Sequence, residues 1–314
     1  MPAASLQRLA ARAGLLAKTR AFFAARQVLE VETPLLCSAP PAENQIEPLA
    51  TLSPLGGEES YYLITSPETA MKRLLAAGSG AIYQICHTFR RGEAGRLHNP
   101  EFTMLEWYRP HWSMEQLMAE VFELVASHLP LTEARYLTFQ EAFIQYCGVD
   151  PFVASLEDLQ QAAHGQGLQP PTNLTREELL DFLLTFCIEV GFGREGGAIF
   201  LTHYPVNRAA MACIDPGPPA TARRFELYVN GLELANGYQE LTDAHEQEAR
   251  LQQANQERQT AGLSPLPLDH HFLAALQAGM PPCSGVALGM DRLVMLATGA
   301  NRLSEVINFP VDRC

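Results

Sequence analysis

Hydrophobic residues recur at helical spacing in three parts of the chain. Apolar positions from Leu6 to Ala25 follow a period near 3.6 residues, which predicts an amphipathic helix, and Ser113 to His128 predicts another. The stretch 139–191 is mostly helical in pattern, with breaks at 148–151 and 165–173. A final helix is expected after Gly289.

Segments of strand character separate these helices. They are rich in β-branched and aromatic residues or alternate between apolar and polar positions. Strands are predicted at 28–36, 61–65, 82–90, 102–108, 199–203, 224–229, 232–241 and 284–288, and residues 38–57 are predicted to be a loop. Because strands and helices follow one another with little βαβ regularity, the order predicts an α+β fold with a mainly antiparallel sheet flanked by helices.

The hairpin FRRGEAGRLHNPEFTMLEWY carries the clearest candidate chemistry. Its second strand alternates, so Phe102, Glu106 and Tyr108 share one face, while Arg90 ends the first strand. A ring to stack on, a carboxylate for an ammonium group and an arginine for a phosphate predict a small-molecule site. A plain hairpin with a solvated basic tip is the alternative that these residues leave open.

A second hairpin, FELYVNGLELANGYQEL, is acidic. The turn signal Asn230-Gly231 suits a two-residue loop, which places Tyr228 opposite Glu233 with Glu226 on the same face. Neighbouring carboxylates repel each other unless a cation lies between them. A metal site or a solvated sheet face would both explain this pattern.

A helix start is expected at Ser66-Pro67-Glu68, with a capping serine, a proline in the first helical position and an acidic residue in the first turn. Glu68 could simply complement the helix dipole or could contribute to a ligand site.

Charge limits the possible partners. The net charge is −13, Lys and Arg together number 22, and lysine occurs only at positions 18 and 72. A protein that holds a whole tRNA normally spends many basic residues on phosphates. The cysteines form no CxxC pair, and neither a membrane-length apolar run nor a signal peptide is evident, so a reduced, cytoplasmic protein without membrane contact is expected.

Three segments, in the proper order, resemble the motifs of the class II aminoacyl-tRNA synthetases, and the second is similar to the lysine branch. Motif 1 corresponds to residues 6–36, motif 2 to 89–108 and motif 3 to GVALGMDRL at 285–293. The resemblance implies one catalytic domain over 1–314, with a helical insertion at about 139–191 between motifs 2 and 3. It also implies a homodimer formed through motif 1, although a plain surface helix packed on a sheet would fit that segment alone.

The resemblance implies ATP as a substrate and Mg²⁺ as a cofactor. Arg90 would contact the α-phosphate and Arg292 the γ-phosphate, which makes these two arginines the catalytic residues. The full set implied for ATP is Arg90, Glu93, His98, Asn99, Phe102, Glu233 and Arg292. Glu226 and Glu233 would hold the metal.

For the amino acid, the resemblance implies a pocket rich in carboxylates. Its implied members are Glu68, Glu106, Tyr108, Asn236, Tyr238, Glu240 and Ala287. Three carboxylates around a small ligand suit a diamino acid, because another substrate would leave them unpaired. Glu233 has the opposite strand parity from Asn236, Tyr238 and Glu240, so if all four face one ligand, a bulge or a sharp twist is expected near 235–237.

Two positions depart from the lysine enzymes. Tyr238 stands where they usually have phenylalanine, and Ala287 stands where they have glycine. One methyl group in a close-fitting pocket can change specificity by about 1–3 kcal/mol. Ordinary α-lysine is therefore not expected to be the preferred substrate, and resemblance to the elongation factor P lysine ligases implies lysine or β-lysine, with (R)-β-lysine favoured.

Motif 1 begins too early for the anticodon-binding domain that precedes it in full lysine synthetases. Among stand-alone cores, the resemblance is to the elongation factor P lysine ligases. It implies an AMP-forming ligase that makes an aminoacyl-adenylate and transfers it to a lysine ε-amine of elongation factor P, without binding a tRNA anticodon. The alternatives are a truncated enzyme that charges tRNA or a tRNA-like acceptor, and a non-catalytic regulatory subunit.

Overall fold

The computed structural model describes residues 2–41 and 46–314, and they form two compact units. The first unit contains the chain up to Leu129 together with Glu240–Cys314, and the second contains Pro130–Gln239. Each unit is described by itself.

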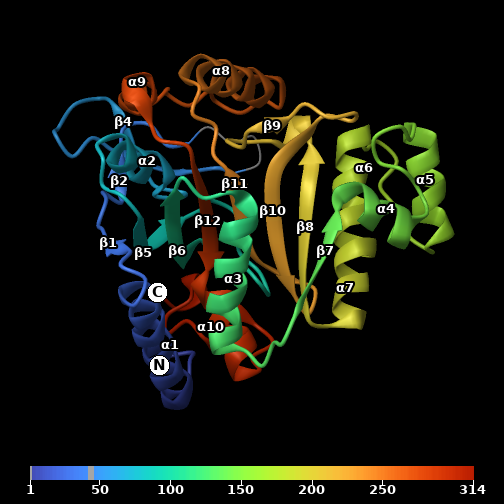
Figure 1. The fold of residues 1–314 in the computed structure, drawn as a ribbon, viewed down its shortest axis with the longest axis horizontal. Coiled ribbons are helices and arrows are strands. Elements are labelled where there is room, and N and C mark those ends of the chain that lie inside the picture. Colours follow the sequence, from blue (N-terminus) through green and yellow to red (C-terminus); the bar gives the residue numbers. More distant parts are fainter. Residues whose placement is uncertain (1, 42–45) are drawn as a thin grey trace. The chain divides into compact units, whose positions relative to one another are not determined.

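The first unit contains four strands that pair in the order β1-β5-β6-β12 (Figure 1). Its strands are β1 (Leu29–Glu30), β5 (Ile82–Phe89), β6 (Glu101–Pro110) and β12 (Cys283–Gly289). β5 and β12 both pair antiparallel with β6, and only β1 runs parallel to its neighbour. A small antiparallel sheet joins β2 (Leu36–Cys37), β4 (Ser60–Leu63) and β3 (Leu49–Leu52).

Helices accompany these strands. They are α1 (Leu6–Ala24), α2 (Glu68–Ala76), α3 (Met114–His128), α8 (Ala244–Thr260), α9 (His270–Gly279) and α10 (Met290–Thr298), with short 3₁₀ turns at Leu303–Glu305 and Val311–Arg313. α3 starts with a reciprocal capping box between Ser113 and Gln116, which satisfies backbone amides that the first turn leaves unpaired. α2 and α9 lie side by side.

The second unit holds the sheet β11-β10-β8-β7, with β9 added to β10. Its strands are β7 (Ala134–Thr138), β8 (Ala198–Pro205), β9 (Ile214–Asp215), β10 (Thr221–Val229) and β11 (Leu232–Gln239). Asn230 and Gly231 have φ of 51° and 76°, as a type I′ turn requires. The predicted hairpin and the pairing of Tyr228 with Glu233 are therefore confirmed.

Helices cover β7 and β8 in this unit (Figure 1). They are α4 (Phe139–Cys147), α5 (Leu156–Gly165), α6 (Arg176–Leu183), a π-helical turn at Leu184–Ile188 and α7 (Glu189–Glu195), followed by a 3₁₀ turn at Val206–Arg208. Phe139 and Phe143 of α4 pack with Leu180 of α6 and Leu201 of β8 in one apolar core. The helices are therefore anchored to the sheet of their own unit by buried apolar surface.

Several predicted elements differ from the structure. The single strand expected at 28–36 is two short strands, β1 and β2, because Pro34 between them cannot donate a ladder hydrogen bond. The expected loop at 38–57 contains β3, while its residues 42–45 lie outside the described part of the chain. β7, α8 and α9 were not predicted.

The start of α2 also differs by one residue. Pro67 is the N-cap instead of the first helical residue, although the Ser66 hydroxyl still accepts a hydrogen bond from the Glu68 amide at 3.0 Å. Across the described residues, 2–41 and 46–314, none of the helices is both long and apolar enough to span a bilayer.

Candidate active site

The residues predicted to bind the nucleotide gather in the first unit. Arg90 follows β5, and its guanidinium lies 5.1 Å from the centre of the Phe102 ring on β6. Arg292, at the start of α10, donates to Nε2 of His98 at 2.8 Å. The structure thus brings the predicted motif 2 and motif 3 side chains into two contacting pairs.

Charge in this cluster suits an anionic ligand. Nε of Arg90 is buried without a hydrogen-bond partner among the described residues, and Glu93 lies 3.7 Å from its Nη1. Burial, and then the charge of Arg292, lowers the pKa of His98, so its imidazole is neutral. A phosphate oxygen would satisfy the buried donor of Arg90.

Asn99 has a different environment. Its amide donates to the carbonyl of Glu101 at 2.6 Å and accepts from the amide of Val311 at 3.0 Å. These bonds tie the motif 2 loop to the end of the chain. A contact between Asn99 and a nucleotide stays a prediction.

Residues of the first unit that were predicted to contact the amino acid form a cluster of buried carboxylates. Glu106 accepts hydrogen bonds from the hydroxyls of Tyr108 at 2.6 Å and Ser66 at 2.7 Å. Glu68 and Glu240 are also buried. Ser66 was expected only to cap a helix, and the structure adds a second role in which it orients Glu106.

A lysine that sequence reasoning missed lies inside this cluster. Nζ of Lys72 is 2.6 Å from Oε1 of Glu68 and 2.6 Å from Oε2 of Glu240, and the residue is 0 % exposed. Burial acts to lower the pKa of Lys72, but Glu240 and Glu68 outweigh it and raise the value above its ordinary level. The side chain is therefore a permanent internal cation.

Burial raises the pKa of two of these carboxylates above the ordinary value of a glutamate. It raises the pKa of Glu106 to about 8, with a further contribution from the charge of Glu68. It raises the pKa of Glu240 to about 7, although Lys72 opposes the shift. Perturbed groups of this kind mark functional sites more often than structural ones.

β12 shapes the same cluster from the neighbouring strand. A Cβ atom on Gly285 would lie 2.3 Å from Cε1 of Tyr108 and 2.4 Å from Oε1 of Glu240, so only glycine fits there. Ala287 pairs directly with Glu106 in the register of β12 and β6. Its methyl group therefore stands on the same face as that carboxylate.

The second unit holds the remaining predicted residues, and its hairpin contains the expected bulge. The pairs Leu227–Ala235 and Tyr228–Glu233 leave Leu234 as the extra residue, one position before the predicted range. Asn236 is paired with Glu226, so the bulge puts Glu233 on the same face as Asn236. The bulge thus explains how Glu233 can share a face with Asn236, although simple strand alternation would put them on opposite faces.

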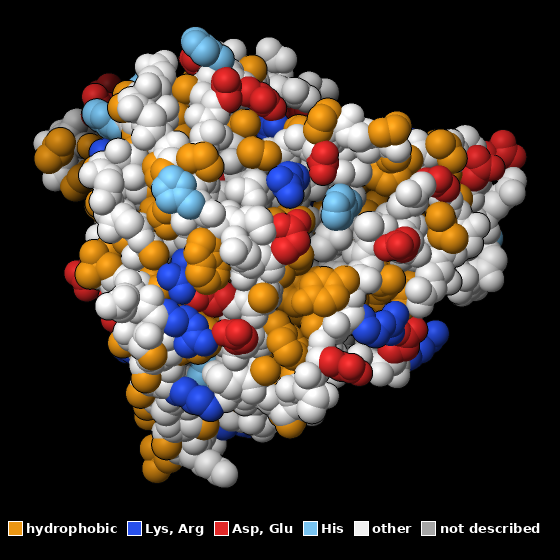
Figure 2. Space-filling view, viewed as in Figure 1, with side chains coloured by type: hydrophobic (Ala, Val, Ile, Leu, Met, Phe, Trp, Pro, Cys, Tyr) orange, Lys and Arg blue, Asp and Glu red, His pale blue; other side chains and the backbone are white. Residues whose placement is uncertain are grey.

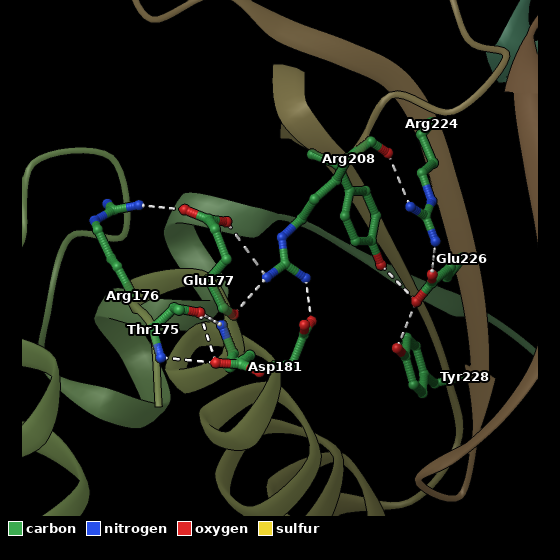
Figure 3. A network of polar contacts seen from close by, with 10 residues as sticks. Thr175, Arg176, Glu177, Asp181, Arg208, Arg224, Glu226 and Tyr228 are labelled. Carbon is green, nitrogen blue, oxygen red and sulfur yellow. Dashed lines mark hydrogen bonds and ion pairs between the residues drawn. The ribbon is translucent and has the colours of Figure 1, made fainter. Parts of the chain in front are cut away.

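Glu226 is the centre of a hydrogen-bonded network (Figure 3). Its Oε2 accepts from the hydroxyls of Tyr204 and Tyr228, each at 2.6 Å, and its Oε1 accepts from Nη2 of Arg224 at 2.5 Å. Arg224 also donates to Oδ1 of Asn236 at 3.1 Å, and the amide of Asn236 donates to the Tyr238 hydroxyl at 2.8 Å. Arg224 thus connects a predicted metal ligand with two predicted substrate contacts.

The network continues to the helices of this unit. Nη1 of Arg224 donates to the carbonyl of Arg208 at 2.9 Å, and the Arg208 guanidinium contacts Asp181 on α6 (Figure 3). It also donates to the carbonyl of Glu177 at 3.0 Å. Neither arginine was singled out in the sequence, because both lie outside the recognisable motifs and each pairs with residues distant along the chain.

The two carboxylates predicted to hold Mg²⁺ are suitable in kind. Oxygen ligands are what this ion prefers, and it commonly takes only one or two from protein carboxylates, with phosphates and water completing the set. Among the residues that the structure describes, no group of three or more His, Cys, Asp or Glu side chains could hold a metal. That Glu226 and Glu233 hold an ion stays a prediction, and it requires Glu226 to share Oε1 with Arg224 or to release it.

Comparison with known proteins gives consistent results. The family model of class II tRNA synthetases (D, K and N) matches residues 3–313. A protein of Salmonella arizonae named elongation factor P--(R)-beta-lysine ligase is 47 % identical over 99 % of this chain and 97 % of its own length. A protein of the same name from Erwinia tasmaniensis is 48 % identical over 100 % of this chain and 98 % of its own.

Proposed function

We propose that this chain, which belongs to the class II tRNA synthetase family (D, K and N), is an ATP-dependent ligase that joins (R)-β-lysine to elongation factor P. The observation that carries the proposal is the buried group of Glu68, Glu106 and Glu240, in which Lys72 supplies a single positive charge. When all three carboxylates are ionised, two negative charges remain for the two ammonium groups of a diamino acid. The names of both relatives agree with such a substrate.

The proposed reaction has two steps. A carboxylate oxygen of the amino acid attacks the α-phosphorus of ATP, and the bond to the bridging β-phosphate oxygen breaks, which gives an aminoacyl-adenylate and pyrophosphate. Arg90 and Arg292 stabilise the negative charge that develops, and Phe102 orients the adenine. No covalent bond to the enzyme is needed.

In the second step, the neutral ε-amine of a lysine on elongation factor P attacks the carbonyl carbon of the adenylate. The bond to AMP breaks, an amide forms and the amine loses a proton. When bound, Mg²⁺ would neutralise phosphate charge, and Glu226 and Glu233 are the residues that would hold it. Because the proposed acceptor is a translation factor, a cytoplasmic location is part of the proposal.

A homodimer through motif 1 also belongs to this proposal. Leu6 and Leu9 of α1 are 84 % and 40 % exposed, and apolar atoms follow the lower left edge of the molecule at α1 (Figure 2). Leu29 of β1 is also exposed. An oligomeric state measured by light scattering, with Leu6→Glu as the disrupting variant, tests this part separately.

The main test separates activation from transfer. Amino-acid-dependent exchange of pyrophosphate into ATP is measured with (R)-β-lysine, α-lysine and norleucine, and activity with (R)-β-lysine exceeding the other two is expected. Mass spectrometry then follows labelled amino acid onto elongation factor P and, in parallel, onto tRNA. Exchange with neither diamino acid would sink the activation step, whereas label on tRNA alone would overturn the proposed acceptor.

A further inference from the structure

Lys72 has no part in the proposed chemistry, yet it is embedded among the residues assigned to the amino acid. It lies one helical turn after Glu68 on α2, while Glu240 reaches it from a distant part of the same unit. Both Nζ–carboxylate distances are 2.6 Å, and Nζ is 5.9 Å from the centre of the Phe272 ring on α9. A buried lysine is costly, so one retained beside a ligand pocket calls for a reason.

The charges of the pocket supply that reason. Three buried carboxylates without a cation would repel one another strongly enough to take up protons. With Lys72 present, Glu68 and Glu240 are drawn to one ammonium group, and Glu106 is held by hydroxyls instead. Once all three carboxylates are ionised, the cluster carries two negative charges that Lys72 does not balance.

We propose that Lys72 is a positioning residue that sets the charge of the amino-acid pocket, so that the pocket accepts a ligand with two ammonium groups in preference to a ligand with one. The identity of the ligand rests on the proposed function, but the effect of Lys72 on charge does not. Lys72 opposes the rise in the pKa of Glu240, and it holds the carboxylates of Glu68 and Glu240 at 2.6 Å from one ammonium group. A purely structural lysine would leave the charge preference and its pH dependence unchanged when replaced.

Other titratable groups could also change the charge of this pocket. They are Glu68 on α2, Glu106 and Tyr108 on β6, Glu240, Cys86 on β5 and the exposed His270 and His271 at the start of α9. Burial raises the pKa of Cys86 to about 12 and that of Tyr108 well above its ordinary value, so both stay neutral. Lys72 is the cation whose charge acts on Glu106 and Glu240. Among the described residues it is also the only buried lysine.

The experiment measures binding of 1,5-diaminopentane and pentylamine to the full chain by calorimetry from pH 6 to 9. The wild-type protein is expected to prefer the diamine, with affinity rising through the range in which Glu240 and Glu106 ionise. In Lys72→Met the midpoint of that rise should move up by about one pH unit or more, and the diamine preference at pH 7 should fall about tenfold. Lys72→Arg should restore the midpoint, because it keeps the charge.

Arg73→Met is the matched control, because Arg73 is the exposed cation next to Lys72 on the same helix. It should leave both the midpoint and the preference unchanged. Lys72→Gln, which can hydrogen-bond to both carboxylates, should shift the midpoint as Lys72→Met does. If Lys72→Met and Lys72→Gln fold and bind like Arg73→Met, the proposal is wrong.

This measurement needs neither ATP nor elongation factor P. A wild-type protein that prefers the diamine but fails in pyrophosphate exchange would overturn the proposed function and leave the role of Lys72 intact. If the wild-type protein activates (R)-β-lysine but Lys72→Met keeps the wild-type midpoint, the role of Lys72 is overturned and the proposed function stands.

Discussion

The two buried carboxylate clusters of this protein differ in how completely the chain itself neutralises them. In the second unit, Glu226 has an arginine at 2.5 Å and two tyrosine hydroxyls at 2.6 Å. In the first unit, Lys72 is shared between Glu68 and Glu240, and Glu106 has only hydroxyl donors among its hydrogen bonds to side chains. The first cluster gains excess negative charge as its carboxylates ionise, whereas Glu226 is paired with an arginine of its own unit.

This difference suggests that Glu226 stabilises the fold, whereas the carboxylates of the first unit bind a ligand. A balanced, fully hydrogen-bonded group has its desolvation offset within the protein, so removal of one partner leaves a buried charge exposed to an apolar environment. An unbalanced group is destabilising until a ligand supplies the missing charge. Removal of a carboxylate should therefore lower the free energy of unfolding in the second cluster and leave it unchanged or higher in the first.

The largest effect is expected for Glu226→Ala, which leaves the half-buried Arg224 without its main counter-charge. Burial acts to lower the pKa of Arg224, and Glu226 is the first of several partners that together raise it. Without Glu226 the guanidinium still keeps its charge, because arginine does not deprotonate in proteins. The free energy of unfolding, measured with urea, should fall by about 3–5 kcal/mol. Glu195→Ala, which breaks the exposed pair with Arg135, should change it by less than about 1 kcal/mol. Equal losses in both variants would remove the distinction between the clusters.

The opposite response is expected for Glu106→Gln in the first unit. Above about pH 8, where Glu106 is ionised, loss of its charge should leave the free energy of unfolding unchanged or higher, because repulsion from Glu68 disappears. Binding of the diamino acid should weaken by about 1.5–3 kcal/mol, or roughly 10- to 150-fold, as one ammonium group loses a charged partner. Calorimetry measures the binding and urea the stability.

Glu101→Gln provides the control on the same strand. Glu101 is exposed and contacts His87 at 2.8 Å, so neither quantity should change beyond error. A Glu106→Gln protein that is clearly less stable than Glu101→Gln would show that Glu106 belongs to the supporting framework.

The sequence predicted the fold class, which the family match and the mostly antiparallel sheets confirm. It also predicted the turn at Asn230-Gly231, because a type I′ turn has a local signature. The bulge lies beside Ala235, at one end of the predicted range, and its extra residue is Leu234. Bulges depend on pairing across strands, which local composition does not encode.

The internal cations could not be predicted in the same way. Glu68 and Lys72 have the spacing of an ordinary exposed helix pair, and only the fold brings Glu240 to the same ammonium group. Arg224 precedes a recognised motif residue, but its bonds to Asn236 and to the carbonyl of Arg208 come from sheet pairing and a loop. In both clusters the sequence identified the carboxylates and missed the cation that sets their charge.

A smaller effect should appear in the pH dependence of the first cluster. The pKa values of Glu106 and Glu240 are raised to about 8 and about 7 from 4.5. Because the folded state holds protons that the unfolded chain releases, the ligand-free protein loses this contribution as the pH rises from about 4.5 to about 8. Affinity for a diamino acid should rise over the same range, since only ionised carboxylates pair with ammonium groups.

The unfolding free energy of the wild-type protein relative to Glu106→Gln isolates this contribution. The difference should decrease steadily from pH 5 to pH 8 and be level above that range. The corresponding difference for Glu101→Gln should be flat throughout. A wild-type curve parallel to that of Glu106→Gln would mean that Glu106 ionises normally.

The smallest effect is expected for Ala287→Gly, which changes the space in the acidic cluster without changing its charge. Ala287 is the direct partner of Glu106 across β12 and β6, so its methyl group limits the room beside that carboxylate. β-Lysine carries its amino group one carbon further from the carboxylate than α-lysine does. Removal of the methyl group should therefore raise the activity with α-lysine relative to (R)-β-lysine by about 1 kcal/mol, or roughly fivefold, in pyrophosphate exchange.

Gly285→Ala tests the reverse change two residues earlier, where a Cβ atom would lie 2.3 Å from Tyr108, and it should impair activity with both substrates alike. If Ala287→Gly leaves the ratio unchanged, the charge of the pocket governs substrate choice and its shape on this strand does not.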